Sequence, residues 1–278
     1  GHLSILNQGV VNLIYKKDEK IAIDSFDLFN LTEKISQLKK HDFKSLPNDI
    51  SLKSINDLTQ SIISSLQTDK PYNWLICEGS SEKIYFDFYF KDLKENKNLR
   101  ILPVGGFKEV KKIYEHLQLP LKDYSKAIKG KVYCLIDTDK QSFDFNPSEE
   151  NTSIVFRRLL NDNTKTNLVK NNYNITFPTE IEDCLNGEIF RKIIGIFDED
   201  IEKILTDPKN IKDNSKNSYY YFDLRDSDRE IIKKFFDKDY GYMKIEFAKK
   251  YVEEIEKGLL YGVEYEIPWI DEIKSFFE

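Results

Sequence analysis

Short apolar runs alternate with longer amphipathic segments along much of the chain, and the two patterns predict different elements. Residues 74–77, 101–104 and 132–136 are continuous apolar runs bounded by polar residues, which is typical of parallel strands covered on both faces. Between the second and third runs, Val110, Ile113, Tyr114 and Leu117 recur at helical spacing, which predicts a helix with one apolar face. Residues 82–93 alternate as a strand would, but their length and crossover position favour a helix.

The first 70 residues follow a different pattern. Val10 to Tyr15 and Ile21 to Ile23 predict two strands that join across a turn at residues 17–19, and residues 29–68 predict polar helices. A polar loop at residues 68–72 is the predicted boundary. We therefore expect a small N-terminal α+β region at 1–70 and an α/β domain at 71–278.

The remaining segments predict further strands near 153–156 and 174–177, and helices at about 187–205, 227–236, 241–257 and 268–277. Gly258 is the expected C-cap of the third of these helices, and Pro268 fits the first turn of the last. Together the patterns predict an α/β fold in which helices flank a mostly parallel sheet, with a helical C-terminal extension.

Composition narrows the class of protein. Among the 278 residues, 40% are hydrophobic and 13% aromatic, which is enough apolar area to exclude disorder. No apolar stretch reaches the roughly 18 residues of a membrane span, and no signal-peptide pattern begins the chain, so we expect a cytoplasmic protein. Three cysteines without a Cys-x-x-Cys pair and three histidines indicate neither a zinc site nor a disulfide framework.

Acidic residues follow three of the predicted strands. Glu78 ends the first buried run, with Glu82 in the first turn of the next helix, and Asp137 and Asp139 end the strongest run. Ligands of open α/β sheets bind beyond the carboxyl ends of the strands, and two nearby aspartates need a compensating cation or proton. Glu82 also suits a helix dipole, and Asp-x-Asp also occurs in ordinary turns.

A third acidic group, Glu180-Ile181-Glu182-Asp183, follows the strand expected near 174–177 and precedes a helix, where acidic residues are common anyway. The ordered set of Glu-Gly, Asp-x-Asp and Glu-x-Glu is more informative than any single member. Such carboxylates can converge on Mg²⁺ or Mn²⁺. The net charge of −6 argues against a protein that coats nucleic acid through a basic surface, but not against a nuclease whose metal ions reverse the local charge.

With these residues in this order, the sequence resembles the TOPRIM domain, the Rossmann-like catalytic domain shared by topoisomerases, primases and several nucleases. The motif Glu78-Gly79-x-x-Glu82, the segment 180–183 and a late Lys244 before Phe247-Ala248 resemble the OLD-family (overcoming lysogenization defect) nuclease branch. The resemblance covers roughly residues 72–255.

The resemblance implies a Mg²⁺- or Mn²⁺-dependent endonuclease or nickase with two ions. Glu78, Glu82 and Asp137 would surround one ion, while Asp139, Glu180 and Glu182 would serve the second. Glu78, Asp137 and Lys244 would be catalytic, with Lys244 neutralising charge on the scissile phosphate; an exposed helix lysine is the alternative for Lys244. Other cations expected to guide the phosphate backbone are Lys108, Arg157 and Arg158.

The same resemblance implies DNA as substrate, with RNA an open alternative, and a role in defence against phage. OLD-family proteins usually have an ABC-type ATPase before the TOPRIM domain, yet this sequence has no Gly-x-x-x-x-Gly-Lys-Ser/Thr loop. The ATPase would belong to the same longer chain or to a separate subunit. Homo-oligomerisation is left open by the sequence.

Two other functions compete with the nuclease. The first is a non-catalytic TOPRIM-like module that docks an ATPase or recombination partner. The second is another Mg²⁺ enzyme that uses Asp-x-Asp, such as a haloacid-dehalogenase-type phosphatase or a sugar-nucleotide transferase. The phosphatase needs its Asp-x-Asp pair after the first strand, whereas here the pair follows the third apolar run.

Overall fold

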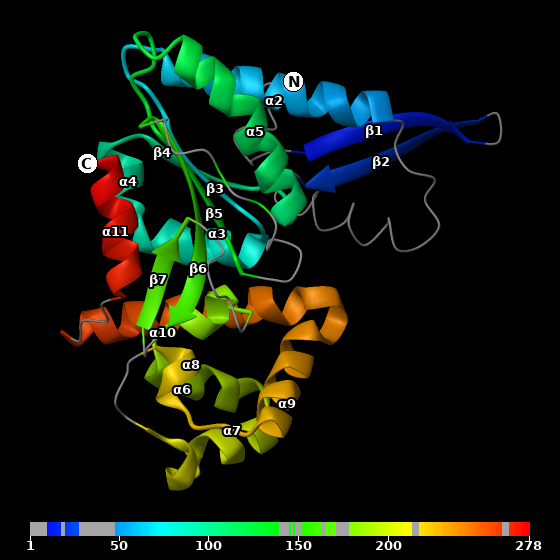
Figure 1. Ribbon diagram of the computed structural model, residues 1–278. Coiled ribbons are helices and arrows are strands. Elements are labelled where there is room, and N and C mark those ends of the chain that lie inside the picture. Colours follow the sequence, from blue (N-terminus) through cyan, green and yellow to red (C-terminus); the bar gives the residue numbers. More distant parts are fainter. Residues whose placement is uncertain are drawn as a thin grey trace.

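The centre of the fold is a five-stranded mixed sheet with the order β4-β3-β5-β6-β7 (Figure 1). Our computed structural model describes residues 10–17, 20–27, 48–138, 145, 147, 152–162, 165–170, 178–212, 217–262 and 267–278. The parallel strands are β3 (Asn73–Cys77), β4 (Leu99–Pro103), β5 (Val132–Ile136) and β6 (Ile154–Asp162), while β7 (Lys165–Val169) is antiparallel to β6. The predicted α/β class with a mostly parallel sheet is therefore confirmed.

Two N-terminal elements match their predictions. The strands β1 (Val10–Lys17) and β2 (Lys20–Asp27) form an antiparallel hairpin. Within the predicted helical segment 29–68, the structure describes one helix, α2 (Asn48–Leu66); residues 28–47 lie outside the described residues.

Helices cover both faces of the sheet because the side chains of its central strands alternate between two apolar clusters. In β3, Trp74 and Ile76 pack with α2 and α5 (Phe107–Asp123), while Leu75 and Cys77 face the other side. That other side is covered by α3 (Ser80–Tyr89), α4 (Lys91–Asn96) and α11 (Pro268–Phe277) (Figure 1). A sheet buried on both faces explains why its strands read as continuous apolar runs.

The helical extension lies beyond the lower end of the sheet in Figure 1. Its elements are the 3-10 turn η2 (Ile181–Cys184), α6 (Gly187–Phe197), α7 (Glu199–Thr206), η3 (Pro208–Asn210), α8 (Ser218–Tyr221), α9 (Asp226–Asp237), η4 (Lys238–Gly241) and α10 (Tyr242–Leu260). The long helix α10 packs against α3 and α6. It thereby joins the extension to the sheet domain.

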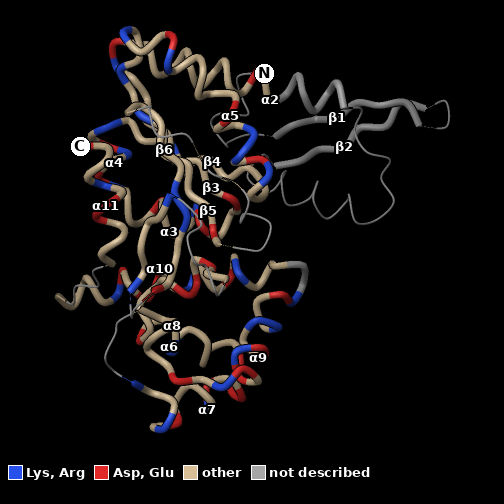
Figure 2. Tube along the Cα trace, in the orientation of Figure 1, with Lys and Arg blue, Asp and Glu red and all other residues tan. Residues whose placement is uncertain are grey.

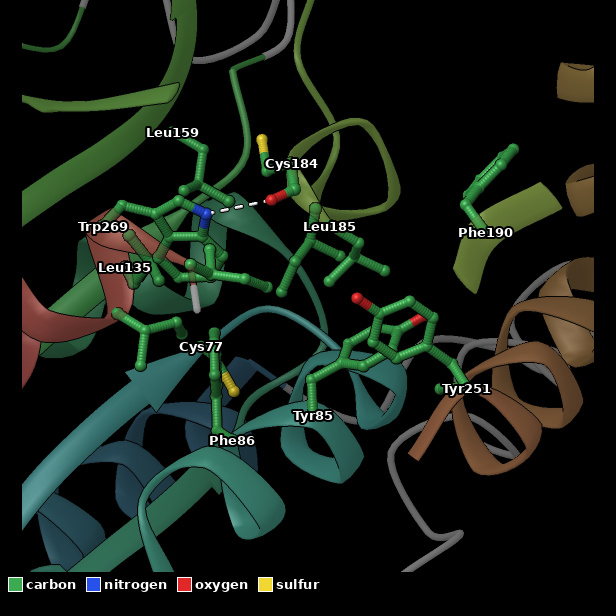
Figure 3. Packing of buried hydrophobic residues seen from close by; sticks show 14 of the residues in the cluster. Cys77, Tyr85, Phe86, Leu135, Leu159, Cys184, Leu185, Phe190, Tyr251 and Trp269 are labelled. Carbon is green, nitrogen blue, oxygen red and sulfur yellow. Dashed lines mark hydrogen bonds between the residues drawn. The ribbon is translucent and has the colours of Figure 1, made fainter. Parts of the chain in front are cut away.

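One apolar cluster continues from the sheet into the extension (Figure 3). Its members include Cys77, Leu135 and Leu159 from the strands, Leu185 from the segment after η2, and Tyr251 from α10. The indole N–H of Trp269 donates to the carbonyl of Cys184 at 3.0 Å. The buried ring therefore supplies a hydrogen-bond donor to the last carbonyl of η2. The extension and the sheet share one core.

Some further predictions are confirmed and others are wrong. The segment 82–93 is helical, as α3 and α4, and Pro268 occupies the first turn of α11. The helix predicted at 187–205 is two helices, because the Asp198 side chain accepts from the N–H groups of Asp200 and Ile201 and starts α7. Gly258 is not a C-cap, since α10 continues to Leu260. The strand predicted near 174–177 lies outside the described residues, and β7 was not predicted.

In the part of the chain that the structure describes, no helix is both long and apolar enough to traverse a lipid bilayer.

Helix α2 precedes the predicted domain boundary, yet it packs with the sheet. Ile62 and Leu66 are fully buried in the cluster that contains Trp74. The Leu66 carbonyl accepts from the N–H groups of Lys129 and Gly130 at 2.9 and 3.2 Å. A Cβ on Gly130 would lie 2.1 Å from the Tyr72 carbonyl oxygen, so only glycine permits this close backbone approach.

We expect Gly130→Ala to lower the free energy of unfolding by about 1–3 kcal/mol, because the added methyl group overpacks the contact with Tyr72 and Leu66. Urea unfolding measures the effect. Lys126→Ala, at an exposed position in the same loop, is the control and should stay within about 0.5 kcal/mol of the wild type. Equal stability of the two variants would contradict this packing.

Candidate active site

Five of the ten predicted site residues line one cavity, which we call the carboxylate cavity. It has a volume of about 280 Å³ and lies beyond the carboxyl ends of β3, β4 and β5. Its acidic lining residues come from segments far apart in the sequence, and a single lysine comes from α10. The lining residues are Glu78, Gly79, Ser80, Ser81, Glu82, Pro103, Gly105, Gly106, Asp137, Ile181, Glu182, Gly241, Lys244 and Ile245.

Glu78 is the first residue after β3, and it accepts hydrogen bonds from the segments that follow β4 and β5. Its carbonyl accepts from the N–H groups of Gly105 and Gly106 at 2.7 and 3.0 Å. Both glycines have positive φ angles, of 92° and 115°, which favour glycine. The Glu78 carboxylate also accepts from the backbone N–H of Asp137 at 2.9 Å. The ends of β3, β4 and β5 are thereby tied together around this one residue.

Glu82 lies in the first turn of α3, where only 6% of it is exposed. Gly79 makes room for its carboxylate, since a Cβ at position 79 would lie 2.7 Å from Glu82 Oε2. The short Glu78-Gly79 turn therefore directs Glu82 into the cavity and not toward solvent.

A pair of backbone hydrogen bonds brings the third acidic segment to β5. The N–H of Thr138 donates to the Thr179 carbonyl at 2.9 Å, and the N–H of Thr179 donates to the Thr138 carbonyl at 2.8 Å. Thr138 is itself fully buried and donates its hydroxyl to the Leu159 carbonyl. This bridge places residues 180–183 directly beside Asp137.

The turn η2 fixes the directions of the acidic side chains within 180–183. Asp183 accepts from the Glu180 N–H at 3.0 Å, and the buried Ser218 hydroxyl donates to the Glu182 carbonyl at 2.5 Å. Asp183 thus closes a capping box. Glu182 points inward and is only 3% exposed.

Lys244 is the cation of the site. Its ammonium lies 2.9 Å from Glu180 Oε2 and 3.6 Å from Glu182 Oε2. The alternative of an exposed helix lysine is wrong, because only a quarter of this side chain is exposed. Burial alone would lower the pKa of Lys244, but the charges of Glu182, Glu180 and Asp137 raise it well above its usual value. Lys244 therefore stays charged at neutral pH.

Three carboxyl groups of the cavity have raised pKa values, because burial removes them from water. Burial and the charge of Glu182 raise the pKa of Glu82 to about 7. Burial and the charges of Glu82 and Glu78 raise the pKa of Asp137 well above its usual value, and burial also raises the pKa of Glu182. Burial is the largest cause of each shift, and the charge of Lys244 opposes these shifts without cancelling them.

A divalent cation fits this donor set. Within the residues that the structure describes, Asp137 Oδ1 and both carboxylate oxygens of Glu182 are buried without a hydrogen-bond partner. Hard carboxylate oxygens are the ligands that Mg²⁺ and Mn²⁺ prefer. Among the described residues, no group of three or more His, Cys, Asp or Glu side chains is arranged as a ready metal site.

The remaining predicted site residues lie outside the carboxylate cavity. Lys108 is exposed in the first turn of α5, next to the glycine turn. Arg157 lies half-buried within β6, where it donates to the Phe156 carbonyl. Glu180 lines an adjacent cavity. Asp139 lies outside the described residues.

Arg158 requires a correction. Its side chain is fully buried, and its guanidinium donates to the Phe145 carbonyl at 2.7 Å. A side chain in this position does not reach a phosphate backbone at the surface, so the predicted phosphate contact of Arg158 is wrong. Its place in β6 explains the error: Arg158 pairs with Ile136 in the register of the sheet, beneath the flanking helix layer.

Several lining residues were not predicted from the sequence. Gly241 starts α10 with a φ of 86° and directs the helix so that Lys244, one turn later, faces the carboxylates. The hydrogen-bonded pair Thr138 and Thr179 had no recognisable motif. Glycine before a helical pattern was the only signal that could have indicated Gly241.

Lysine and arginine residues are interspersed with acidic residues over the described chain, without segregation by sign (Figure 2). The acidic character of the cavity is therefore local. Comparisons of the chain with protein-family models, with curated proteins and with solved structures found no match.

We expect Glu82→Gln to stabilise the protein in EDTA by about 1–3 kcal/mol above pH 7, because a carboxylate whose pKa is raised by folding destabilises the folded state when it is charged. Thermal unfolding measures this. The exposed Glu95→Gln is the control with the same change of charge and should have little effect. A Glu82→Gln variant less stable than the wild type would contradict the proposed repulsion.

Proposed function

We propose that this chain is a metal-dependent nuclease of the TOPRIM type, related to the OLD-family branch, that hydrolyses phosphodiester bonds of nucleic acid, with DNA as the first candidate. The supporting observation is the carboxylate cavity, where Glu78, Glu82, Asp137 and Glu182 meet Lys244 beyond the strand ends of a mostly parallel sheet. An ABC-type ATPase, in a longer chain or as a separate subunit, is part of this proposal.

The proposed roles follow from position. Asp137 and Glu182 have buried oxygens that find no hydrogen-bond partner in the described part of the chain, so they are the first candidates to hold a cation. Glu78 and Glu82 line the same cavity and add negative charge to it. Divalent cations bound there would supply a nucleophile at neutral pH and neutralise charge on the leaving oxygen.

Lys244 would act on the scissile phosphate. Its ammonium is already placed among the acidic side chains and remains charged. A phosphate that enters the cavity would offer this ammonium another anionic partner, and the charge that develops during hydrolysis would strengthen that contact. Glu180, which holds Lys244 at 2.9 Å, would orient it.

The test is a nicking assay on supercoiled plasmid and on DNA and RNA strands, with Mg²⁺, Mn²⁺ or EDTA. We expect cleavage with either metal and none in EDTA. Asp137→Asn and Glu78→Ala should fold normally and lose cleavage, because the donors to the cation are removed while the hydrophobic core is unchanged.

The control for these variants is Asp123→Asn, which changes an exposed carboxylate at the end of α5 and should cleave as the wild type does. Normal nicking by purified Asp137→Asn would contradict the assigned site. Binding of nucleic acid by the wild type without cleavage at any metal concentration would favour the non-catalytic module instead.

We expect Lys244→Met to lower kcat about 10²- to 10³-fold, the effect typical of losing one group that stabilises transition-state charge. Lys249→Met, on the exposed face of the same helix, is the matched control. Thermal unfolding of both variants separates a loss of chemistry from a loss of fold. A folded Lys244→Met protein that cleaves at the wild-type rate would refute the role given to this lysine.

A further inference from the structure

A second cavity, of about 500 Å³, adjoins the carboxylate cavity. The two share Glu182, and Glu180 lies between Lys244 and the second cavity. The other lining residues belong to the segment around η2, to α6, α8 and α9, and to the short segment between α8 and α9. Its volume is within the range of small-molecule sites. It lies next to the cavity in which the proposed reaction would take place.

The inner wall of the second cavity is aromatic. Phe190, Phe222 and Phe236 are buried there, and the ring of Phe190 lies 6.3 Å from that of Phe222 and 6.0 Å from that of Phe236. The half-buried side chains of Leu224 and Ile232 add to this wall. An apolar wall of this kind suits a flat, weakly hydrated ring system.

The rim of the second cavity is cationic. The Arg229 guanidinium lies 4.0 Å from the centroid of the Tyr219 ring, and Lys233 follows one helical turn later on α9. Within the described chain, no carboxylate lies at ion-pair distance from Arg229 or Lys233, whereas Arg225 on the same helix is paired with Asp228. Two cations beside an aromatic ring are therefore available to an anionic partner.

The acidic lining residues restrict how such a partner would lie. Four acidic residues also line the second cavity, and their charges repel a phosphate: Glu180, Glu182, Asp183 and Asp226. A phosphate is favoured only beside Arg229 and Lys233, while an uncharged ring is favoured against the phenylalanines. The cavity thus separates a place for an anion from a place for an aromatic group.

We propose that the second cavity binds an unpaired nucleotide of the nucleic-acid substrate, next to the phosphodiester that the carboxylate cavity receives. The base packs against the aromatic wall, and its phosphate binds Arg229 and Lys233. Base stacking on aromatic rings and on guanidinium groups is the usual basis of single-strand recognition. This inference rests on the proposed nuclease function, and it predicts a preference for single-stranded or frayed substrates.

The experiment measures binding separately from cleavage. Fluorescence anisotropy follows a short fluorescein-labelled DNA strand, alone or annealed to its complement, with Ca²⁺ in place of Mg²⁺. We expect Arg229→Ala and Tyr219→Leu each to weaken binding of the single strand about 5- to 150-fold, and to weaken duplex binding less. Lys234→Ala, an exposed position on α9 outside the cavity, removes the same charge and should change binding less than about twofold.

The outcomes separate the two proposals. If the wild type binds and cleaves DNA while Arg229→Ala and Tyr219→Leu bind as tightly as the wild type, the nucleotide site is overturned and the nuclease remains. If Lys234→Ala weakens binding as much as Arg229→Ala, charge alone accounts for binding, which also overturns the site. If the wild type neither binds nor cleaves any nucleic acid, both proposals fall. Thermal unfolding checks that each variant is folded.

Discussion

The candidate site depends on the burial of several carboxylates beside one another, because burial and their mutual charges both disfavour the ionised forms. Glu78, Glu82, Asp137 and Glu182 line one small cavity, and Lys244 is the only cation among the described residues that line it. The fold holds them together despite raised pKa values for Glu82, Asp137 and Glu182. Such an arrangement costs stability unless a cation or protons compensate for it. A divalent cation would supply that compensation, and the same charge would make the cavity attractive to phosphate.

Rigid backbone connections hold this arrangement in place. Glu78 ties the ends of three strands together through hydrogen bonds to the glycine turn and to Asp137. The hydrogen-bonded pair Thr138 and Thr179 places Glu180 and Glu182 beside β5. The helical extension shares its core with the sheet, and its helix α10 places Lys244 beside Glu180 and Glu182. A second cavity adjoins the first and shares Glu182 with it. Its lining includes an aromatic wall and the cations Arg229 and Lys233.

The sequence predicted the sheet well because strands buried on both faces read as continuous apolar runs. It also predicted that Glu78, Asp137 and Glu182 meet, since the carboxyl ends of parallel strands share one edge. It failed for Arg158, because a charge within a strand looks the same whether it faces solvent or a buried carbonyl. The antiparallel strand β7 and the residues of the second cavity depend on tertiary packing and had no periodic pattern. The TOPRIM assignment and the metal remain proposals that these residues support.

The central claim is that one cavity gathers carboxylates from distant segments around a divalent cation. Anomalous diffraction from crystals soaked in Mn²⁺ tests it most directly, because the signal locates the ion without reference to any activity. We expect an anomalous peak within about 2–2.5 Å of carboxylate oxygens of Asp137 and its neighbours in the carboxylate cavity. A well-measured map without a peak in that cavity, at a Mn²⁺ concentration that saturates other sites, would contradict it.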